Sequence, residues 1–480
     1  MSEWKSVFDA NISLYVRIIV EHLLNNGWQM ISVNDYTRNM PSFSCMDALK
    51  TNDYQKEGLF PIVSQSKDLI SGYTDNKQLV NKIDSPIIIF GDHTQVVKYI
   101  DFDFVLGADG TKILTVSKDY LPKFLYYIIK SIDLHSNKYA RHYSKLRKEK
   151  IPYCKDSINI QEKIVAFLDS LAENAIEEKN YFDKIIESKI ISLQKECLNI
   201  CLIEKENEKQ KSYAKQLRQN ILQEAIEGKL TADWRKQHPI QKGNPDYDAE
   251  VLFDKIQAEK SRTKSSKKTV SPITKDKIPF EIPTGWKWVR LEEIALLITD
   301  GEHSTPSRID TYEGYYLLSA RNIRNEGISL NDVDFVDKNE YERINKRCNP
   351  RRGDVLISCS GSIGRSCVVC DNNNYVMVRS AAMIRINELN SIFICYSLQS
   401  IFLQKQIKDS ILKSVQPNLF LGAIKNLYLP LPPLAEQKEI VARVEKHLEA
   451  ITQLETQIAT RETTTKQLMQ GLLKEAFAEG

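Results

Sequence analysis

Gly285-Trp286-Lys287-Trp288-Val289 decides the fold, because it is the second copy of Gly27-Trp28-Gln29-Met30-Ile31. Two further stretches recur in the same order. Gln161-Glu162-Lys163-Ile164-Val165-Ala166 returns as Gln437-Lys438-Glu439-Ile440-Val441-Ala442, and residues 215–225 return as residues 466–476. The residues between these echoes do not match. The sequence therefore predicts a scaffold duplicated around two different domains, with a function that grips something bipartite.

Length and composition bound the class of protein. The chain has 480 residues, and single cores stop growing at about 250 to 300 residues, so two or more domains are expected. Its 42% hydrophobic and 27% charged residues are typical of a soluble protein. The 66 Lys and Arg against 63 Asp and Glu leave a net charge of +3, which neither requires nor excludes a nucleic-acid partner. Local basic clusters must decide that question.

Nine cysteines and no secretory leader suit a reducing compartment, so a cytoplasmic protein without a disulfide framework is expected. The apolar run at residues 12–24 contains Arg17, Glu21 and His22. It is too short to span about 30 Å of hydrocarbon. This run predicts a packed helix, and no membrane segment is expected.

Short β-branched runs bounded by Gly, Asp and Pro predict strands in both halves. The runs are residues 61–63, 86–90 and 112–116 in the first half, and 315–319, 353–358 and 375–379 in the second. Helices are predicted at 121–132 and 392–412. The fold class is therefore α/β, with one mixed α/β domain in each half.

Two long seams of apolar residues predict coiled-coil-like helices. The first runs over residues 160–202, and as one continuous helix it would be roughly 60 Å long. The second begins at Glu436, with Val444, Ile451 and Ile458 seven residues apart. Two narrow seams are most simply buried against each other, in antiparallel orientation. The alternative is that each seam packs on its own domain.

Short polar residues and arginines lie just past the predicted strand ends of the second half. The candidate contacts are His303, Ser304, Thr305, Arg321, Asn322, Ser362, Arg365, Arg379, Gln416 and Asn418. Arg pairs with guanine, Asn or Gln with adenine, and Ser or Thr with phosphate, so this set suits the reading of base edges in DNA. Taken singly, each residue is better explained as an ordinary turn or surface charge.

The first half has its own candidate contacts with DNA. They are Gln65, Ser66, Asp92, His93, Thr94, Lys98, Arg141, Lys145 and Arg147. The basic run from Arg141 to Lys150 would neutralise several phosphates. The alternative is a solvated helix face.

Motifs of catalysis fail one by one. Ser360-Gly361-Ser362-Ile363-Gly364 has Ser where a nucleophile elbow needs Gly, and Cys367 and Cys370 lack a second pair for zinc. Asn244-Pro245-Asp246-Tyr247 is similar to the adenine-holding tetrapeptide of amino-methyltransferases, but no Gly-rich loop for S-adenosylmethionine accompanies it. A P-loop is also absent. We therefore expect no catalytic residue, no metal and no cofactor on this chain.

The chain resembles the specificity subunit of a type I restriction-modification system over essentially its whole length. The motifs that carry the resemblance are Gly285-Trp286-Lys287-Trp288-Val289-Arg290-Leu291, Leu429-Pro430-Leu431-Pro432-Pro433-Leu434-Ala435-Glu436-Gln437, residues 217–222, and Glu227-Gly228-Lys229-Leu230-Thr231-Ala232-Asp233-Trp234-Arg235. The duplicated order of the echoes is more specific than any one motif.

This resemblance implies a non-catalytic subunit that recognises double-stranded DNA. Two target-recognition domains would each read one half of a bipartite site, and two long helices would hold them apart while docking two methyltransferase subunits. Those partners would flip an adenine in each half-site for N6 methylation. Restriction motor-nuclease subunits would add translocation and cleavage. S-adenosylmethionine, ATP and magnesium would be used by the partners.

The resemblance divides the chain into five parts. They are a first target-recognition domain (1–152), a first spacer helix with a partner-docking region (153–235), a connector with a basic linker (236–283), a second target-recognition domain (284–430) and a second spacer helix (431–480). A short helix is expected at 248–259 within the connector, and the basic run at 260–268 either touches phosphate or is solvated.

The two copies depart from symmetry. Gln161 and Lys215 are 54 residues apart, whereas Gln437 and Lys466 are 29 apart, and the residues before Gly27 have no counterpart. Two alternatives stay open on the sequence. One is the specificity subunit of another restriction architecture, with methylase and nuclease fused in one partner, and the other is a coiled-coil scaffold that binds proteins.

Overall fold

The protein forms two compact units in the computed structural model. The structure describes residues 2–38, 46–107, 110–134, 141–176, 180–263, 273, 278–411 and 417–478. Unit 1 comprises Met1–Asn207 and Arg461–Gly480, and unit 2 comprises Glu208–Thr460. Two long helices, α6 (Lys184–Ile226) and α14 (Leu434–Ala478), contribute residues to both units.

Unit 1 is built on three helices that pack together. Helix α1 (Glu3–Asn25) begins where the Ser2 hydroxyl accepts from Lys5 N, as an N-cap does. Its apolar face packs against α3 (Pro122–Ser131) and α5 (Ile158–Glu173). The prediction of a packed helix at residues 12–24 is confirmed.

The strands that the structure describes in unit 1 form three small sheets. The first pairs β1 (Gln29–Ser32) with β9 (Lys150–Tyr153); the second has the order β6 (Val97–Ile100), β5 (Ile87–Gly91), β8 (Thr111–Leu114); the third has the order β3 (Gly72–Thr74), β2 (Phe60–Val63), β7 (Phe104–Leu106), β4 (Val80–Asn81). Alternate residues of β5 face opposite sides, as strand geometry requires. Ile88 and Phe90 join the core that includes α3, whereas Ile87 and Ile89 join Val63 and Phe104 in a second core.

Short helices complete unit 1. They are α2 (Val33–Arg38), α4 (Tyr143–Leu146) and the 3-10 turns η1 (Thr51–Asp53) and η2 (Lys77–Leu79). The strands predicted at residues 61–63, 86–90 and 112–116 and the helix predicted at 121–132 correspond to β2, β5, β8 and α3.

Unit 2 has the same kind of architecture with a different topology. Its sheets are β10 (Lys287–Arg290) with β20 (Tyr428–Leu431); β11 (Ala295–Asp300), β19 (Ala381–Ile386), β16 (Val355–Ser358), β17 (Ser366–Val368); β15 (Asp334–Phe335), β12 (Tyr315–Leu318), β18 (Asn374–Met377); and β13 (Ile323–Arg324) with β14 (Gly327–Ile328). Its helices are α7 (Ala232–Gln237), α8 (Ala249–Thr263), α9 (Leu291–Ile294), η4 (Ala320–Asn322), α10 (Lys338–Asn345), α11 (Ser391–Gln399), α12 (Ile401–Ile411) and α13 (Leu421–Asn426). The short helix predicted at 248–259 is α8.

The echoes of the sequence mark the same structural device in each unit. Gly27 and Gly285 adopt φ angles of +87° and +89°, which favour glycine, and the tryptophan after each is buried. The strand that follows pairs in each case with the strand leading into a helix. Gln161 and Gln437 are both fully buried. Their side-chain oxygens accept from the backbone N–H of Leu121 and Asn390, the N-cap residues of α3 and α11, at 2.7 and 3.0 Å.

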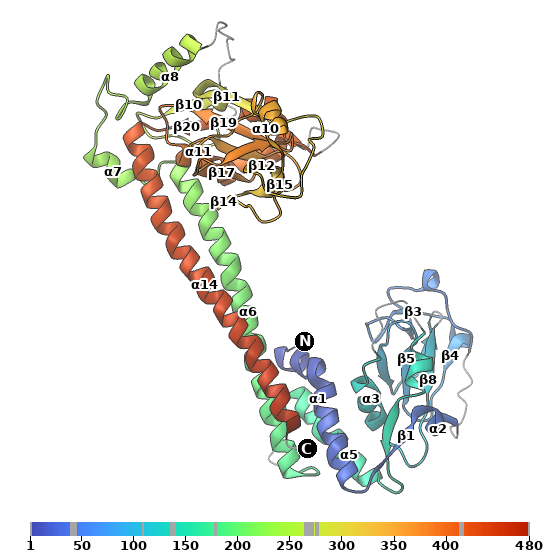
Figure 1. The fold of residues 1–480 in the computed structure, drawn as a ribbon. Helices are drawn as coiled ribbons and strands as arrows, with labels where there is room; N and C mark the ends of the chain where they lie inside the picture. Colours follow the sequence, from blue (N-terminus) through green and yellow to red (C-terminus); the bar gives the residue numbers. More distant parts are fainter. Residues whose placement is uncertain are drawn as a thin grey trace. The chain divides into compact units, whose positions relative to one another are not determined.

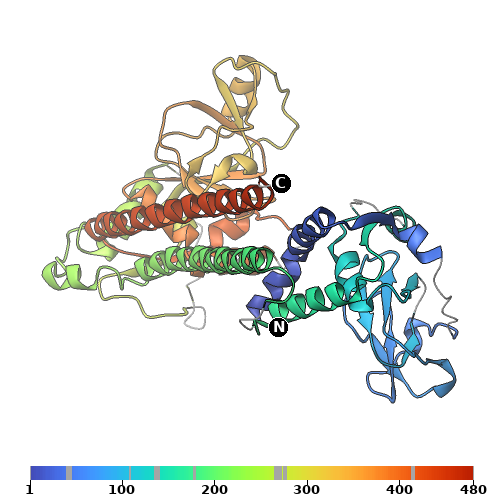
Figure 2. The ribbon, with the colours of Figure 1, turned by 90° about the horizontal axis from the view of Figure 1, so that it is seen from below.

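The long helices lie side by side and antiparallel (Figures 1 and 2). In unit 2, Arg218 of α6 lies 3.1 Å from Glu455 of α14, whereas Leu230 O, just past the end of α6, accepts from Arg443 at 2.9 Å, so the helices run in opposite directions. In unit 1, Ile190 of α6 shares a core with Ala476. The prediction of two antiparallel, coiled-coil-like helices is confirmed.

The prediction of one continuous helix over residues 160–202 is wrong. Helix α5 ends at Glu173, because Asn174 adopts the left-handed conformation with φ 55° that terminates helices. The long helix starts again at Lys184. Helix α5 and this break account for the longer spacing of the first copy. Likewise, the helix predicted at 392–412 is two helices, separated at the extended residue Ser400.

Candidate nucleic-acid interface

The loops that follow the strand ends of unit 2 meet at one end of its β-structure. Ser380 is central, because its backbone oxygen accepts from Cys359 N at 2.7 Å and its hydroxyl accepts from Ala320 N at 3.0 Å. Cys359 O accepts in turn from Leu419 N at 2.8 Å. Arg379 N donates to Glu302 O at 2.9 Å, which joins a further loop. Loops 300–307, 319–322, 359–365, 378–380 and 417–419 therefore form one surface, which we call the unit 2 loop cluster.

Arg321 and Asn322 are engaged within this cluster. Arg321 Nη2 lies 2.6 Å from Asp334 Oδ1, and Arg321 Nη1 lies 3.5 Å from Asp332 Oδ2. Asn322 is fully buried, and its Oδ1 accepts from Ser319 N at 2.9 Å. Asn322 therefore shapes its loop from inside. Arg321 must give up its ion pairs with Asp332 and Asp334 before its guanidinium can bind any external ligand.

His303 and Ser304 are held by acidic residues that the sequence motifs did not single out. His303 Nε2 lies 2.8 Å from Asp300 Oδ2, and Ser304 donates to Glu302 Oε1 from its N and Oγ at 2.9 and 2.7 Å. The two bonds from Ser304, with a contribution from Arg343, lower the pKa of Glu302 to about 2. Asp300 and Glu302 are close in sequence to these candidate contacts, and that proximity was the signal that could have identified them. Carboxylates at a surface that binds DNA must be neutralised before DNA can approach.

Arg365 and Arg379 present the available positive charge of the unit 2 loop cluster. Arg379 is exposed and Arg365 is half-exposed, and within the described ranges neither guanidinium has a hydrogen-bond or ion-pair partner. Thr305, Ser362 and Asn418 are polar neighbours with equally unoccupied side chains in that part of the chain, and Gln416 lies outside the described residues. Two free arginines among hydroxyl and amide groups suit contacts with guanine edges and phosphates.

The candidate contacts of unit 1 also gather at one end. Gln65 Oε1 accepts from His93 N at 3.3 Å, and Gln65 O accepts from Thr94 Oγ1 at 2.7 Å. Asp92 is buried, and its Oδ1 accepts from Tyr143 N at 2.8 Å. These bonds join loops 64–71, 91–96 and 141–147 into a surface that we call the unit 1 loop cluster.

Gly91 permits the close approach of two of these loops. A Cβ atom at this position would lie 2.3 Å from Thr94 Oγ1 and 2.8 Å from Gln65 Cβ. Any larger residue would therefore force the loops apart.

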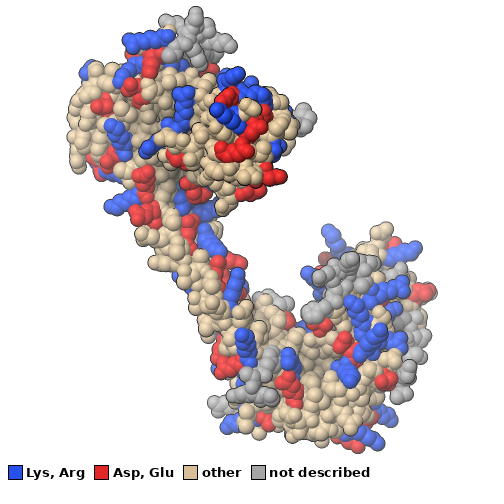
Figure 3. All heavy atoms as spheres, viewed as in Figure 1, with Lys and Arg blue, Asp and Glu red and all other residues tan. Residues whose placement is uncertain are grey.

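Exposed cations border the unit 1 loop cluster. Arg141, Lys145 and Arg147 are all exposed, and the Arg147 guanidinium donates to Asn34 Oδ1. The run forms a single helical turn before β9, so a long basic helix face does not exist here. Figure 3 shows Lys and Arg side chains gathered on the face of unit 1 that this view presents. Such a group suits contacts with phosphate.

Ser66 is half-buried and bonded within its own loop, and Lys98 is buried. Ser66 Oγ lies 2.8 Å from Ser71 Oγ, and Lys98 is only 4% exposed. Lys98 therefore lies beneath a loop of the cluster and is not placed as a direct contact with DNA, which corrects the expectation from the sequence.

The motif at residues 227–235 clamps the beginning of α14 in unit 2. Glu436, which is buried, accepts from Thr231 Oγ1 and Trp286 Nε1 at 2.7 Å each and pairs with Arg235 Nη1 at 2.5 Å. A second pair joins Asp233 to Arg443 through two bonds of 2.6 and 3.0 Å, which lowers the pKa of the Asp233 carboxyl.

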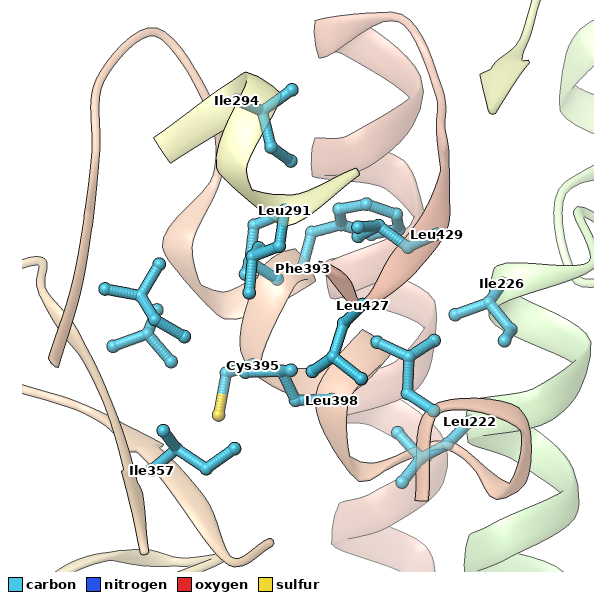
Figure 4. Packing of buried hydrophobic residues seen from close by; sticks show 14 of the residues in the cluster. Leu222, Ile226, Leu291, Ile294, Ile357, Phe393, Cys395, Leu398, Leu427 and Leu429 are labelled. Carbon is cyan, nitrogen blue, oxygen red and sulfur yellow. The ribbon is translucent and has the colours of Figure 1, made fainter. Parts of the chain in front are cut away.

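Apolar packing supports this clamp. Figure 4 shows Leu222 and Ile226 of α6 beside Leu427, which precedes β20, and Leu429, which lies within β20. The end of one long helix and the domain that precedes the other thus share a core within unit 2. The duplicated motifs are therefore structural joints.

No group of three or more His, Cys, Asp or Glu residues in the described ranges is arranged to hold a metal ion. Nor does any described helix combine the length and apolarity needed to cross a membrane.

Comparison with known proteins finds similarity to a known family in part of the chain. Residues 283–461 match the family described as type I restriction modification DNA specificity domain. The chain is 29% identical over 170 residues to the Escherichia coli type I restriction enzyme EcoBI specificity subunit, covering 35% of this chain and 36% of that protein. It is 31% identical over 135 residues to the Escherichia coli EcoR124I/EcoR124II specificity subunit, covering 25% and 33% respectively.

Solved structures of similar proteins align over most of the chain. The HsdS subunit from Thermoanaerobacter tengcongensis aligns with 17% identity and a TM-score of 0.41, covering 94% of this chain and 96% of that one. The S subunit from M. genitalium aligns with 14% identity and a TM-score of 0.33, covering 94% and 96%.

Residues 283–461 are thus similar to the DNA specificity domain of type I restriction-modification systems. The chain is related to the specificity subunits of type I restriction enzymes, which confirms the resemblance indicated by the duplicated motifs. In the matches above, the chain spans about a third of the length of the curated relatives.

Proposed function

We propose that this chain is the sequence-recognition subunit of a type I restriction-modification complex and reads a bipartite site in double-stranded DNA. One observation carries the proposal: residues 283–461, which match the specificity-domain family, contain the unit 2 loop cluster with its two unpaired arginines. Arginine and small polar side chains at strand ends can enter the major groove, where each base pair has a distinct pattern of donors and acceptors.

Each unit would read its own half-site. The loop clusters differ in composition, because unit 2 offers Arg365 and Arg379 whereas unit 1 offers Gln65, Thr94 and a border of exposed cations. The sheets behind them also differ in strand order. Different surfaces recognise different base patterns, so the two half-sites should be unlike and the whole site asymmetric.

The long helices would dock two methyltransferase subunits, and restriction subunits would join that complex. Exposed leucine side chains on the helices support this proposal, since apolar groups exposed along a helix pair fit partner helices. They are Leu202, Leu217, Leu454, Leu468 and Leu473. The chain itself would stay non-catalytic in the cytoplasm, and S-adenosylmethionine, ATP and magnesium would be bound by the partners.

Docking is tested by placing charge at exposed positions of the long helices. Leu217→Glu with Leu468→Glu should leave the isolated chain folded, because both side chains are exposed, while copurification of the methyltransferase subunits is lost. Leu330→Glu is the matched control, since Leu330 is exposed on the domain of unit 2 and outside both long helices. If the wild-type chain, the double variant and Leu330→Glu all copurify equally with the methyltransferase subunits, docking on the helices is contradicted.

A further inference from the structure

The loop of residues 64–71 in the unit 1 loop cluster is ordered by its own serines. Ser64 Oγ and Ser66 Oγ each lie 2.8 Å from Ser71 Oγ. Ser71 N donates to Ile62 O at 2.8 Å, which closes the base of the loop. These bonds fix the two ends of the loop and leave its tip, residues 67–69, exposed.

Lys98 supports that tip from below. It lies on β6 opposite Ile89 of β5, and its Nζ donates to the backbone oxygen of Asp68 and, at 3.4 Å, to that of Leu69. Only 4% of Lys98 is exposed. The burial lowers the pKa of its ammonium to about 8, although the Asp68 carboxylate acts in the opposite direction.

A buried ammonium is a costly way to hold a loop, because the charge loses its hydration. An apolar side chain would fill the same space without that cost but would donate to neither the Asp68 nor the Leu69 carbonyl of the exposed tip. Lysine has three donors on one atom, so it can bind two converging carbonyls at once. The two bonds of Lys98 therefore fix the direction in which the tip of the loop points.

We propose that Lys98 is a positioning residue that sets how unit 1 reads its half-site. Resting on the proposed function, this inference holds that Lys98 fixes the backbone of residues 67–69 so that the tip meets one base pattern. Lys98 itself does not contact DNA. Its loss should relax recognition at the first half-site and leave the second unchanged.

The test compares Lys98→Met with Lys98→Arg in the complex with methyltransferase subunits. Methylation of a DNA library randomised in both half-sites gives the base preference at each position. Lys98→Met should reduce discrimination at one or more positions of the first half-site by about tenfold, the scale of one good base contact. Lys98→Arg should retain it, because a guanidinium also donates to two carbonyls.

Hydrogen exchange of the free proteins separates positioning from unfolding. Lys98→Met should speed exchange of the amides of residues 66–71 and leave the rest of unit 1 protected. If it unfolds unit 1, Lys98→Gln replaces it, since glutamine keeps a donor without charge. A faster-exchanging loop with unchanged base preferences overturns the inference. Wild-type complex without any preference at the first half-site would instead overturn the proposed function.

Discussion

Glu436 should be among the most costly side chains to remove from unit 2. It is a buried carboxylate whose side chain is 2% exposed and which accepts from Thr231, Arg235 and Trp286. Breaking a buried ion pair by removing one partner costs about 3 to 5 kcal/mol. Arg235 is 22% exposed and keeps a bond to Gly228 O, so we expect the lower end, about 3 kcal/mol, for Glu436→Ala.

Glu439→Ala is the matched control on the same helix. Glu439 is 30% exposed and pairs with Arg443, which retains its two bonds to Asp233 after the change. Partly exposed pairs of this kind contribute about 0 to 1 kcal/mol. Urea unfolding followed by tryptophan fluorescence gives both free energies, since Trp286 lies at the clamp. Equal losses for the two variants would refute the clamp.

Two further predictions concern the loop clusters. Arg379→Ala should weaken binding to the second half-site by about 1 to 3 kcal/mol. Arg321→Ala should weaken binding less, because the Arg321 guanidinium is already paired with Asp334. Titration of the complex with half-site variants measures both effects, and a larger effect at Arg321 would contradict the assignment. Lys145→Ala with Arg147→Ala should weaken binding to all sequences alike and lower the slope of log affinity against log salt by about 2; a loss confined to one sequence would contradict a phosphate role.

The duplicated scaffold was predictable because local patterns determine it. Repeated Gly-Trp strands, buried glutamines and seven-residue seams are each visible over a few residues, and the structure places them in the same roles in both units. The break at Asn174 was not predictable, because the apolar period continues on both sides of it while a single left-handed residue ends the helix.

The candidate contacts were predictable as loops but not as free or engaged groups. Arg321 and Asp334 belong to separate elements, so their ion pair depends on the tertiary fold. Lys98 did carry a local signal: on its strand it shares a face with Ile100, which is also buried, whereas Val97 and Tyr99 on the other face are only half-buried. A charged residue at an inward strand position indicates a structural role before a contact role.

Exchange of the second domain tests the reading of a bipartite site most directly. Residues 284–430 would be replaced by the corresponding domain of another type I specificity subunit, and the methylated sites of the host would be mapped by sequencing with both proteins. We predict that one half of the methylated sequence changes and that the other half and its distance stay the same. A change in both halves, or in neither, would contradict two independent readers.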